Sequence, residues 1–307
     1  MKIDFHNNRK LVHLLMIILV VLWGLEYIAA KFALEAFDPL SLTFCKYAVA
    51  ALAFLVVRIF QKKKFYLKRK HILTLVLCAL FGQILYFAAE YSAMGYLPVS
   101  TISIILAFVP LLSIVIEAII NKRKPNTIIV LGIIVCILGV SIIIGVDFDE
   151  ILSGKWIGYV LAFSLILFWN AYNFITERLS GSYESSHLAF MQVLAATLLS
   201  LPIAIAQSPE IHGVSPEIIG YVLFLGITSG FLGFLIYVMA ISVIGPTPCA
   251  LYSNFLPIST SILGWIFLGE KLTMLQMLGG VIVIASAAVV IWQKGVLDDK
   301  YRSQGGA

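Results

Sequence analysis

Charged side chains are scarce in this chain. Asp, Glu, Lys and Arg make up 12% of its 307 residues, whereas 61% of the residues are hydrophobic. Soluble domains have about 25% charged residues, so this composition and the mean hydropathy of +1.01 exclude an ordinary globular protein. The expected solvent of most of the chain is therefore a lipid bilayer.

Residues suited to metal or covalent chemistry are also few. The four cysteines lie singly in different apolar segments, which predicts neither a disulfide framework nor a zinc site. The five histidines lie at membrane boundaries or in terminal and loop segments. No Walker loop, HExxH or GxSxG pattern is present. We therefore expect no metal, no cofactor and no enzymatic activity.

Long apolar stretches dominate the chain. A membrane-spanning helix needs about 20 apolar residues, and ten stretches of that kind are separated by short polar breaks. They are residues 11–35, 40–60, 71–95, 99–121, 126–146, 155–178, 186–206, 215–243, 247–268 and 273–293. The sequence thus predicts an all-α integral membrane protein with ten transmembrane helices.

Lysine and arginine gather in alternate loops, and this asymmetry predicts orientation. With ten spans, 17 of the 21 cations fall on one side, and only Lys155 and Lys271 fall on the other. Both termini are therefore expected in the cytoplasm. Loops that face anionic lipid also account for the net charge of +5 without a nucleic-acid partner.

The stretch from Pro98 to Ser141 recurs as Gly245 to Ser286. A shift of 147 residues brings several identical residues together: Ala93 and Ala240, Phe108 and Phe255, Pro110 and Pro257, Leu131 and Leu278, and Gly132 and Gly279. Each recurring stretch lies near the end of one half of the chain, and each half has five of the ten predicted helices. Because five is an odd number, the second half enters the membrane from the opposite side. This predicts two inverted repeats, 11–146 and 155–293, followed by a short cytoplasmic tail, 294–307. Inverted repeats are typical of secondary transporters with a site between the halves.

Four ionisable residues lie within predicted helices at similar depth: Glu26, Lys31, Lys46 and Glu90. A charge at the bilayer centre costs at least about 2.5–3.5 kcal/mol, so such residues face a bundle interior or water and find partners. We expect them to form one polar cluster, with Glu26, Lys46 and Glu90 as candidate substrate or ion ligands. The alternative is a set of structural ion pairs, with Lys31 reaching outward to the interface.

Uncharged polar and aromatic residues extend the candidate site to Tyr86, Tyr172, Gln192, Tyr237 and Asn254. Their alternative roles are helix–helix hydrogen bonding and aromatic packing. Pro110 and Pro257 occupy matching helix centres, where proline frees a backbone carbonyl. Two prolines at equivalent positions favour a hinge or gate over a simple kink.

The chain resembles the EamA-type transporters of the drug/metabolite transporter superfamily over nearly its whole length. The residues that carry the resemblance are Trp23, Gly24, Tyr86 to Glu90, Tyr91, Ala93, Met94, Pro98, Pro110, Trp169, Ala171, Tyr172, Arg178, Asn254, Pro257, Phe267 to Lys271 and Gly279. The resemblance implies a ten-helix inverted-repeat carrier in a bacterial cytoplasmic membrane that exports amino acids or other small metabolites. Lys46 stands where many relatives have arginine, which removes bidentate carboxylate binding. We expect Glu270, despite its motif, to be a structural cap.

These observations together predict a secondary active transporter that works by alternating access. A carboxylate removed from water is costly in its charged form, so Glu26 or Glu90 can carry protons during the cycle. The mixed charges suit a zwitterion, whereas a purely cationic solute would be repelled by Lys46. Two alternatives remain open: a membrane enzyme acting on lipid-linked substrates, and a non-transporting partner or sensor subunit.

Overall fold

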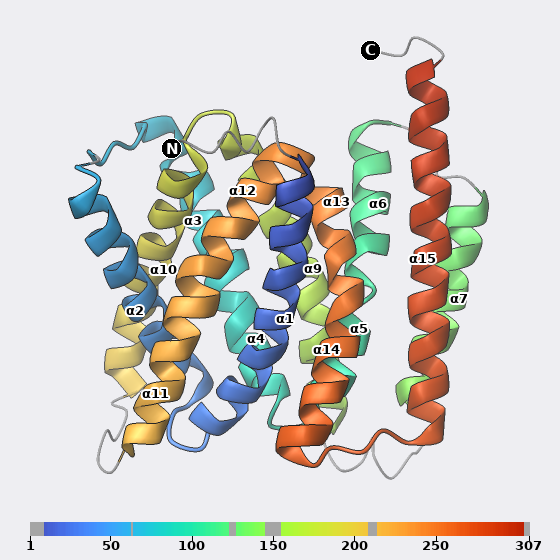
Figure 1. Cartoon of the computed structure of the whole chain (residues 1–307), viewed down its shortest axis with the longest axis horizontal. Coiled ribbons are helices and arrows are strands. Elements are labelled where there is room, and N and C mark those ends of the chain that lie inside the picture. Colours follow the sequence, from blue (N-terminus) through green and yellow to red (C-terminus); the bar gives the residue numbers. More distant parts are fainter. Residues whose placement is uncertain (1–8, 63, 123–126, 145–154, 208–213, 304–307) are drawn as a thin grey trace.

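The structure is a computed structural model that describes residues 9–62, 64–122, 127–144, 155–207 and 214–303. Throughout these ranges the regular structure is helical, with no β-strand. The helices run side by side along one common direction (Figure 1), as the predicted all-α membrane class requires. Four of the counted cations, Lys2, Lys63, Arg123 and Lys124, lie outside the described residues.

Eight helical stretches are long and apolar enough to cross a membrane. They are Arg9–Ala33, Pro39–Phe60, Arg69–Ala93, Val99–Ile120, Lys155–Ser180, Ser185–Ala206, Pro216–Ile244 and Pro246–Leu268. The other two predicted spans correspond to α7 (Thr127–Ile144) and α15 (Met274–Ser303), in which the described apolar stretches are shorter. The total of ten spanning helices and the inverted repeat therefore stay predictions.

The end of α15 differs from the sequence-based expectation. The last span was expected to end at 293, but α15 continues as helix to Ser303. Most of the segment that we assigned to a separate tail is thus the end of a helix. The run from Lys294 to Ser303 lacks proline, and its one glycine, Gly295, does not stop the helix.

Local sequence signals explain where several helices begin and end. The first two are α1 (Arg9–Ala33) and α2 (Pro39–Phe60). The Asp38 carboxylate caps α2 by accepting hydrogen bonds from the backbone N–H groups of Leu40 and Ser41 at 3.1 and 3.0 Å. Gly245 and Gly269 adopt φ values of 85° and 65°, which favour glycine and end the preceding helices.

The predicted hinge prolines lie beside interruptions in their helices. One span consists of α5 (Val99–Leu106) and α6 (Val109–Ile120), and the other of α13 (Pro246–Leu251), η4 (Tyr252–Phe255), α14 (Leu256–Leu263) and η5 (Gly264–Leu268). Pro110 and Pro257 are each the second residue of the helix that resumes after the break. Proline lacks an N–H donor and clashes with the preceding turn, which explains the position of both breaks.

Two further spans contain π-helical segments at equivalent positions. The first span comprises η1 (Arg69–His71), α3 (Ile72–Ala79), η2 (Leu80–Leu85) and α4 (Tyr86–Ala93), and the second comprises α11 (Pro216–Phe224), η3 (Leu225–Gly233) and α12 (Phe234–Ile244). Shifted by 147 residues, η2 falls within η3. Gly226 and Gly230 of η3 lie against Val49, Ala50 and the Lys46 carbonyl of α2. An added Cβ at either glycine would collide with α2, so these two residues allow the helices to pack closely.

Helices from both parts of the sequence form the centre of the bundle. The second part of the sequence begins with α9 (Lys155–Ser180) and α10 (Ser185–Gln207). Helix α9 packs against α3, η2, α4 and α12, while α1 packs against η3, α12 and α14. Helices α7 and α15 pair with each other at one side of the bundle (Figure 1).

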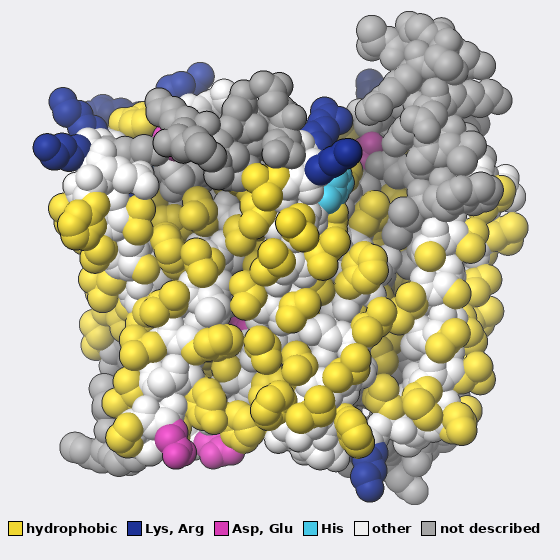
Figure 2. All heavy atoms as spheres, in the orientation of Figure 1, with side chains coloured by type: hydrophobic (Ala, Val, Ile, Leu, Met, Phe, Trp, Pro, Cys, Tyr) yellow, Lys and Arg dark blue, Asp and Glu magenta, His cyan; other side chains and the backbone are white. Residues whose placement is uncertain are grey.

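The surface separates by polarity. Hydrophobic side chains cover the flank of the bundle, and lysine and arginine gather mainly at the end where α1 begins (Figure 2). Acidic side chains are visible at the opposite end of the same face. An apolar flank between polar ends is the form that a multi-pass membrane protein needs.

Candidate functional site

A buried ion pair joins α1 to α2 at the centre of the bundle. The Lys46 ammonium donates to Glu26 Oε1, and both side chains are almost fully buried, with exposed fractions of 0% and 2%. Ser229 of η3 donates its hydroxyl to Glu26 Oε2 at 2.5 Å, and the Tyr91 hydroxyl lies 3.4 Å from Oε1. Protein groups therefore compensate the Glu26 charge at both carboxylate oxygens.

Glu90 is a second buried carboxylate, on α4, with fewer partners. The Tyr27 hydroxyl donates to Glu90 Oε1 at 2.6 Å. The other oxygen, Oε2, is buried and has no hydrogen-bond partner among the described residues. Since buried polar atoms are seldom left without a partner, this oxygen is available to a ligand or a proton.

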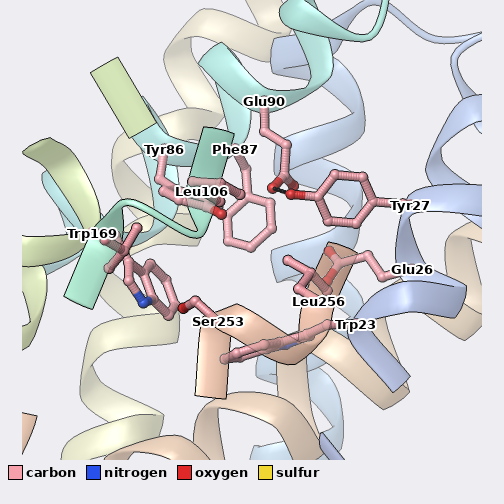
Figure 3. A pocket seen from close by; sticks show the side chains of 11 residues that line it. Trp23, Glu26, Tyr27, Tyr86, Phe87, Glu90, Leu106, Trp169, Ser253 and Leu256 are labelled. Carbon is pink, nitrogen blue, oxygen red and sulfur yellow. Dashed lines mark hydrogen bonds between the residues drawn. The ribbon is translucent and has the colours of Figure 1, made fainter. Parts of the chain in front are cut away.

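Both carboxylates border one small cavity between the two parts of the sequence. Its lining residues are Trp23, Glu26, Tyr27, Tyr86, Phe87, Glu90, Leu106, Val109, Trp169, Ser253 and Leu256. Figure 3 shows the Phe87, Tyr27, Trp23 and Trp169 rings around the open space, with the Glu90 carboxylate directed towards Tyr27. The volume is about 20 Å³, so the cavity has room for about one water molecule. The bundle is thus nearly closed around this central pocket.

Aromatic rings form much of the pocket wall. Trp23 meets Trp169 edge to face with ring centroids 5.7 Å apart, and Tyr86 lies 4.8 Å from Trp169. Tyr237 packs behind them, where its hydroxyl accepts a hydrogen bond from Trp169 Nε1 at 3.0 Å. Trp169 is therefore held in orientation by a residue that does not itself line the pocket.

Lys46 does not line this pocket. Its ammonium lies 3.3 Å from the centroid of the Phe87 ring, and Phe87 is a lining residue. The cation is thus shared between Glu26 and an aromatic face, a favourable cation–π geometry. Lys46 belongs to the charged cluster, as predicted, but it is not among the residues that line the cavity.

Lys31 is not part of the cluster, contrary to our expectation. Its ammonium donates to the backbone carbonyl of Met94, near the end of α4. It lines a separate, wider cavity of about 600 Å³ at the mouth of the bundle, together with Asp38, Tyr91 and Glu270. Lys31 is five residues, more than one helical turn, beyond Glu26, which explains why it lies nearer the interface.

Tyr91 connects this wider cavity, which we call the vestibule, to the charged cluster. The residue lines the vestibule, and its hydroxyl approaches Glu26. The side chain is nevertheless 1% exposed. Tyr91 therefore separates the vestibule from the ion pair in this closed state.

The remaining candidates lie outside the central pocket. Gln192 accepts a hydrogen bond from the Tyr172 hydroxyl at 3.0 Å and donates one to Thr176 Oγ1 at 3.0 Å, which ties α9 to α10. Asn254 is buried beside the lining residue Ser253, and its Oδ1 has no partner among the described residues. Of the eight candidates, the structure brings Glu26, Tyr86 and Glu90 to the pocket wall.

The two helix breaks border the pocket at equivalent positions. Leu106 and Val109 flank the break between α5 and α6, while Ser253 and Leu256 lie at the break before α14. Each pair is related to the other by the shift of 147 residues. Asn170 of α9 donates its Nδ2 to the Val109 carbonyl at 3.2 Å and so holds the first break against the bundle.

The same two interrupted spans are joined at one end by Glu270. Its carboxylate accepts hydrogen bonds from the Val99 and Ser100 N–H groups at 2.9 and 3.3 Å, and from the Ser100 hydroxyl at 2.8 Å. We call this contact the Glu270 clasp. Glu270 is thus a structural cap, as predicted, but the helix that it caps is α5 and not its own turn.

A second carboxylate joins these spans at the other end. Thr247 at the start of α13 donates its hydroxyl to Glu117 Oε2 of α6 at 2.5 Å, a contact that we call the Glu117 clasp. Thr247 is the residue that the shift of 147 pairs with Ser100. The shift pairs Glu117 with Gly264, where an added Cβ would lie 3.0 Å from Glu270 Oε2. The Glu270 and Glu117 carboxylates thus occupy corresponding places at the two ends of the interrupted spans, although the shift of 147 residues does not pair these two residues with each other.

Comparison with known proteins identifies the fold and its family. A model of the EamA-like transporter family matches residues 10–145 and again residues 156–292. The chain belongs to the EamA-like transporter family. An uncharacterized transporter of Archaeoglobus fulgidus is 25% identical over 89% of this chain and 94% of its own length. The uncharacterized transporter YyaM of Bacillus subtilis is 24% identical over 85% of this chain and 87% of its own length.

A solved crystal structure supports the same fold. It superposes on 91% of this chain and 98% of its own chain with a TM-score of 0.68 and 17% sequence identity. Membership of the EamA-like family and the multi-helix fold identify the chain as a membrane transporter with a small-molecule substrate. The predicted resemblance is therefore confirmed.

Several residues in and around the central pocket were not among the sequence-based candidates. Tyr27 follows Trp23 by four residues, so helical spacing places both on one face of α1. Ser253 and Leu256 follow from Leu106 and Val109 once the shift of 147 is applied to the helix breaks. Ser229 does not line the pocket but donates to Glu26, and no sequence signal distinguished it between Gly226 and Gly230.

Proposed function

We propose that this chain is a secondary active transporter that exports amino acids or related small metabolites across a bacterial cytoplasmic membrane by alternating access. The observation that carries the proposal is the position of the central pocket. It lies beside both interrupted helices and contains Glu90 Oε2, a buried oxygen without a partner among the described residues. The family and the printed names of the relatives support transport.

Alternating access is supported by the two clasps. They join the same pair of spans at opposite ends, and the helix breaks lie between them. Opening one clasp while the other holds would expose the pocket to one side of the membrane only. Each half of an interrupted helix would then move as a rigid segment about its break.

Glu90 is also the proposed site of proton coupling. Its unpartnered oxygen can hold either a proton or a polar substrate group, and competition between the two would couple their movement. In proteoliposomes, substrate movement should then release or take up protons, detected with a pH-sensitive dye inside the vesicles. Substrate movement with no proton flux would contradict coupling while leaving transport itself intact.

The proposal is tested by comparing metabolites inside and outside cells that express the wild-type chain, the Glu90→Gln variant or an empty vector. We expect at least one ammonium-bearing metabolite to accumulate outside wild-type cells only. Membrane insertion of both proteins is measured in parallel. Identical metabolite profiles despite equal insertion would favour a non-transporting partner or sensor subunit.

A further inference from the structure

The residues around the central pocket have an unequal charge distribution. Two lining residues, Glu26 and Glu90, are acidic, and none of the described residues that line the pocket is Lys, Arg or His. The nearby cation, Lys46, has its ammonium against the Phe87 ring and the Glu26 carboxylate. A solute in the pocket therefore meets negative charge without a facing cation.

The two carboxylates differ in what they still require. Glu26 is compensated by Lys46 and by hydroxyl groups at both oxygens. Glu90 interacts only with the uncharged Tyr27 and Tyr86 hydroxyls at hydrogen-bond range, and its buried Oε2 has no well-formed hydrogen bond in the described part of the chain. An unpaired buried charge is unfavourable, and a cationic N–H donor from a ligand would remove most of that cost.

Aromatic faces complete the environment of Glu90. Tyr27, Tyr86, Phe87 and the two tryptophans Trp23 and Trp169 all line the same cavity (Figure 3). Ring faces attract ammonium groups through their quadrupoles, and they also accept an apolar ligand body. The wall offers no positively charged partner for a ligand carboxylate, which would stand beside Glu26.

We propose that the central pocket selects small organic amines, with the protonated ammonium group bound at Glu90, over the amino acids that share their side chains. This inference rests on the part of the proposed function that makes the central pocket the transport site, and among the small metabolites proposed there it favours amines over amino acids. It also reverses the preference for zwitterions that the sequence suggested. That preference required Lys46 to face the substrate, whereas Lys46 pairs with Glu26, contacts the Phe87 ring and does not line the pocket.

The test uses the purified full-length chain and three matched ligands: 3-methylbutylamine, leucine and 3-methylbutanol. All three have the same branched alkyl group; leucine adds a carboxylate to the amine, and the alcohol replaces the ammonium by a hydroxyl. Binding is measured by tryptophan fluorescence, because Trp23 and Trp169 line the pocket, and by thermal stabilisation. We expect the amine to bind about tenfold or more tighter than leucine, and the alcohol to bind more weakly than the amine.

A pair of variants locates the effect. Glu90→Gln should weaken amine binding about tenfold or more. Glu217→Gln, which removes an exposed carboxylate at the start of α11, should leave amine binding unchanged. If Glu90→Gln fails to fold, the relative affinities of the wild-type protein for the three ligands still test the inference. The inference would be overturned if leucine bound as tightly as the amine or if Glu90→Gln bound the amine as well as the wild-type protein does. It would also be overturned if none of the three ligands bound. The metabolite comparison in cells judges the proposed function separately.

Discussion

At the residue scale, the central carboxylates differ in how far the protein compensates their charge. Glu26 belongs to a complete local network, whereas Glu90 retains an oxygen without a partner among the described residues. A compensated carboxylate contributes mainly to the structure, and an incompletely compensated one is suited to binding. The two residues should therefore respond differently to loss of charge.

Glu26→Gln should destabilise the protein strongly because it leaves Lys46 buried without its counter-ion. Removing one partner of a buried pair costs about 3–5 kcal/mol, because the other charge is left buried without compensation, and removing that charge as well should relieve most of this cost. The double variant Glu26→Gln with Lys46→Met should therefore recover most of the lost stability. Thermal unfolding in detergent measures both variants. A double variant no more stable than Glu26→Gln alone would contradict this account of the pair.

The charged residues of the site were predictable from the sequence, but their partners were not. Glu26, Lys46 and Glu90 were identified because charge inside a membrane helix requires compensation. Position along a helix gives depth, whereas partner choice also depends on how each helix is rotated and which neighbour it meets. For that reason Lys31 was placed in the cluster, although its ammonium binds the Met94 carbonyl.

At the scale of helices, the two interrupted spans combine flexibility at their centres with contacts at their ends. The breaks before Pro110 and Pro257 border the pocket, and the Glu270 and Glu117 clasps join the same spans at opposite ends. Sequence periodicity and proline predicted the breaks. The clasps depend on contacts between distant segments and were missed, apart from the capping role of Glu270.

Breaking one clasp should open the pocket towards the corresponding face. Hydrogen bonds to charged groups contribute about 1.5–3 kcal/mol, enough to shift an equilibrium about tenfold or more. Glu270→Ala should increase labelling of Ser253→Cys by a membrane-impermeant thiol reagent from the face where α5 begins. Glu117→Ala should increase it from the face where α6 ends.

The labelling experiment uses a background in which the four native cysteines are replaced. Glu35→Ala serves as the control, because Glu35 lines the vestibule but belongs to neither clasp. Unchanged labelling in both clasp variants, or an increase from the same face in both, would be inconsistent with alternating clasps.

At the scale of the whole molecule, the helical membrane class followed from composition and the family from the resemblance carried by individual residues, while the total of ten spans stays a prediction. Continuous apolar runs predict helices in lipid regardless of how they pack. Among the described residues, the apolar stretches of α7 and α15 are shorter than those of the eight candidate spans. Whether these two helices cross the bilayer depends on their surroundings in lipid, which composition alone does not specify.

The distribution of lysine and arginine predicts that both termini lie in the cytoplasm. Green fluorescent protein fused to the C-terminus should therefore fluoresce, and alkaline phosphatase fused there should be inactive. Alkaline phosphatase fused after Lys271 should instead be active, because Lys271 is one of the two cations assigned to the outer side. An active phosphatase at the C-terminus would reverse the orientation and the assigned direction of each clasp.

Counterflow in proteoliposomes tests the central claim most directly. Vesicles are loaded with an unlabelled solute identified by the cell comparison, and a trace of labelled solute is added outside. A carrier with one alternately accessible site should accumulate label transiently above equilibrium, and Glu90→Gln should abolish this overshoot. Label that only equilibrates with the wild-type protein, or an overshoot that persists in Glu90→Gln, would contradict alternating access through the Glu90 pocket.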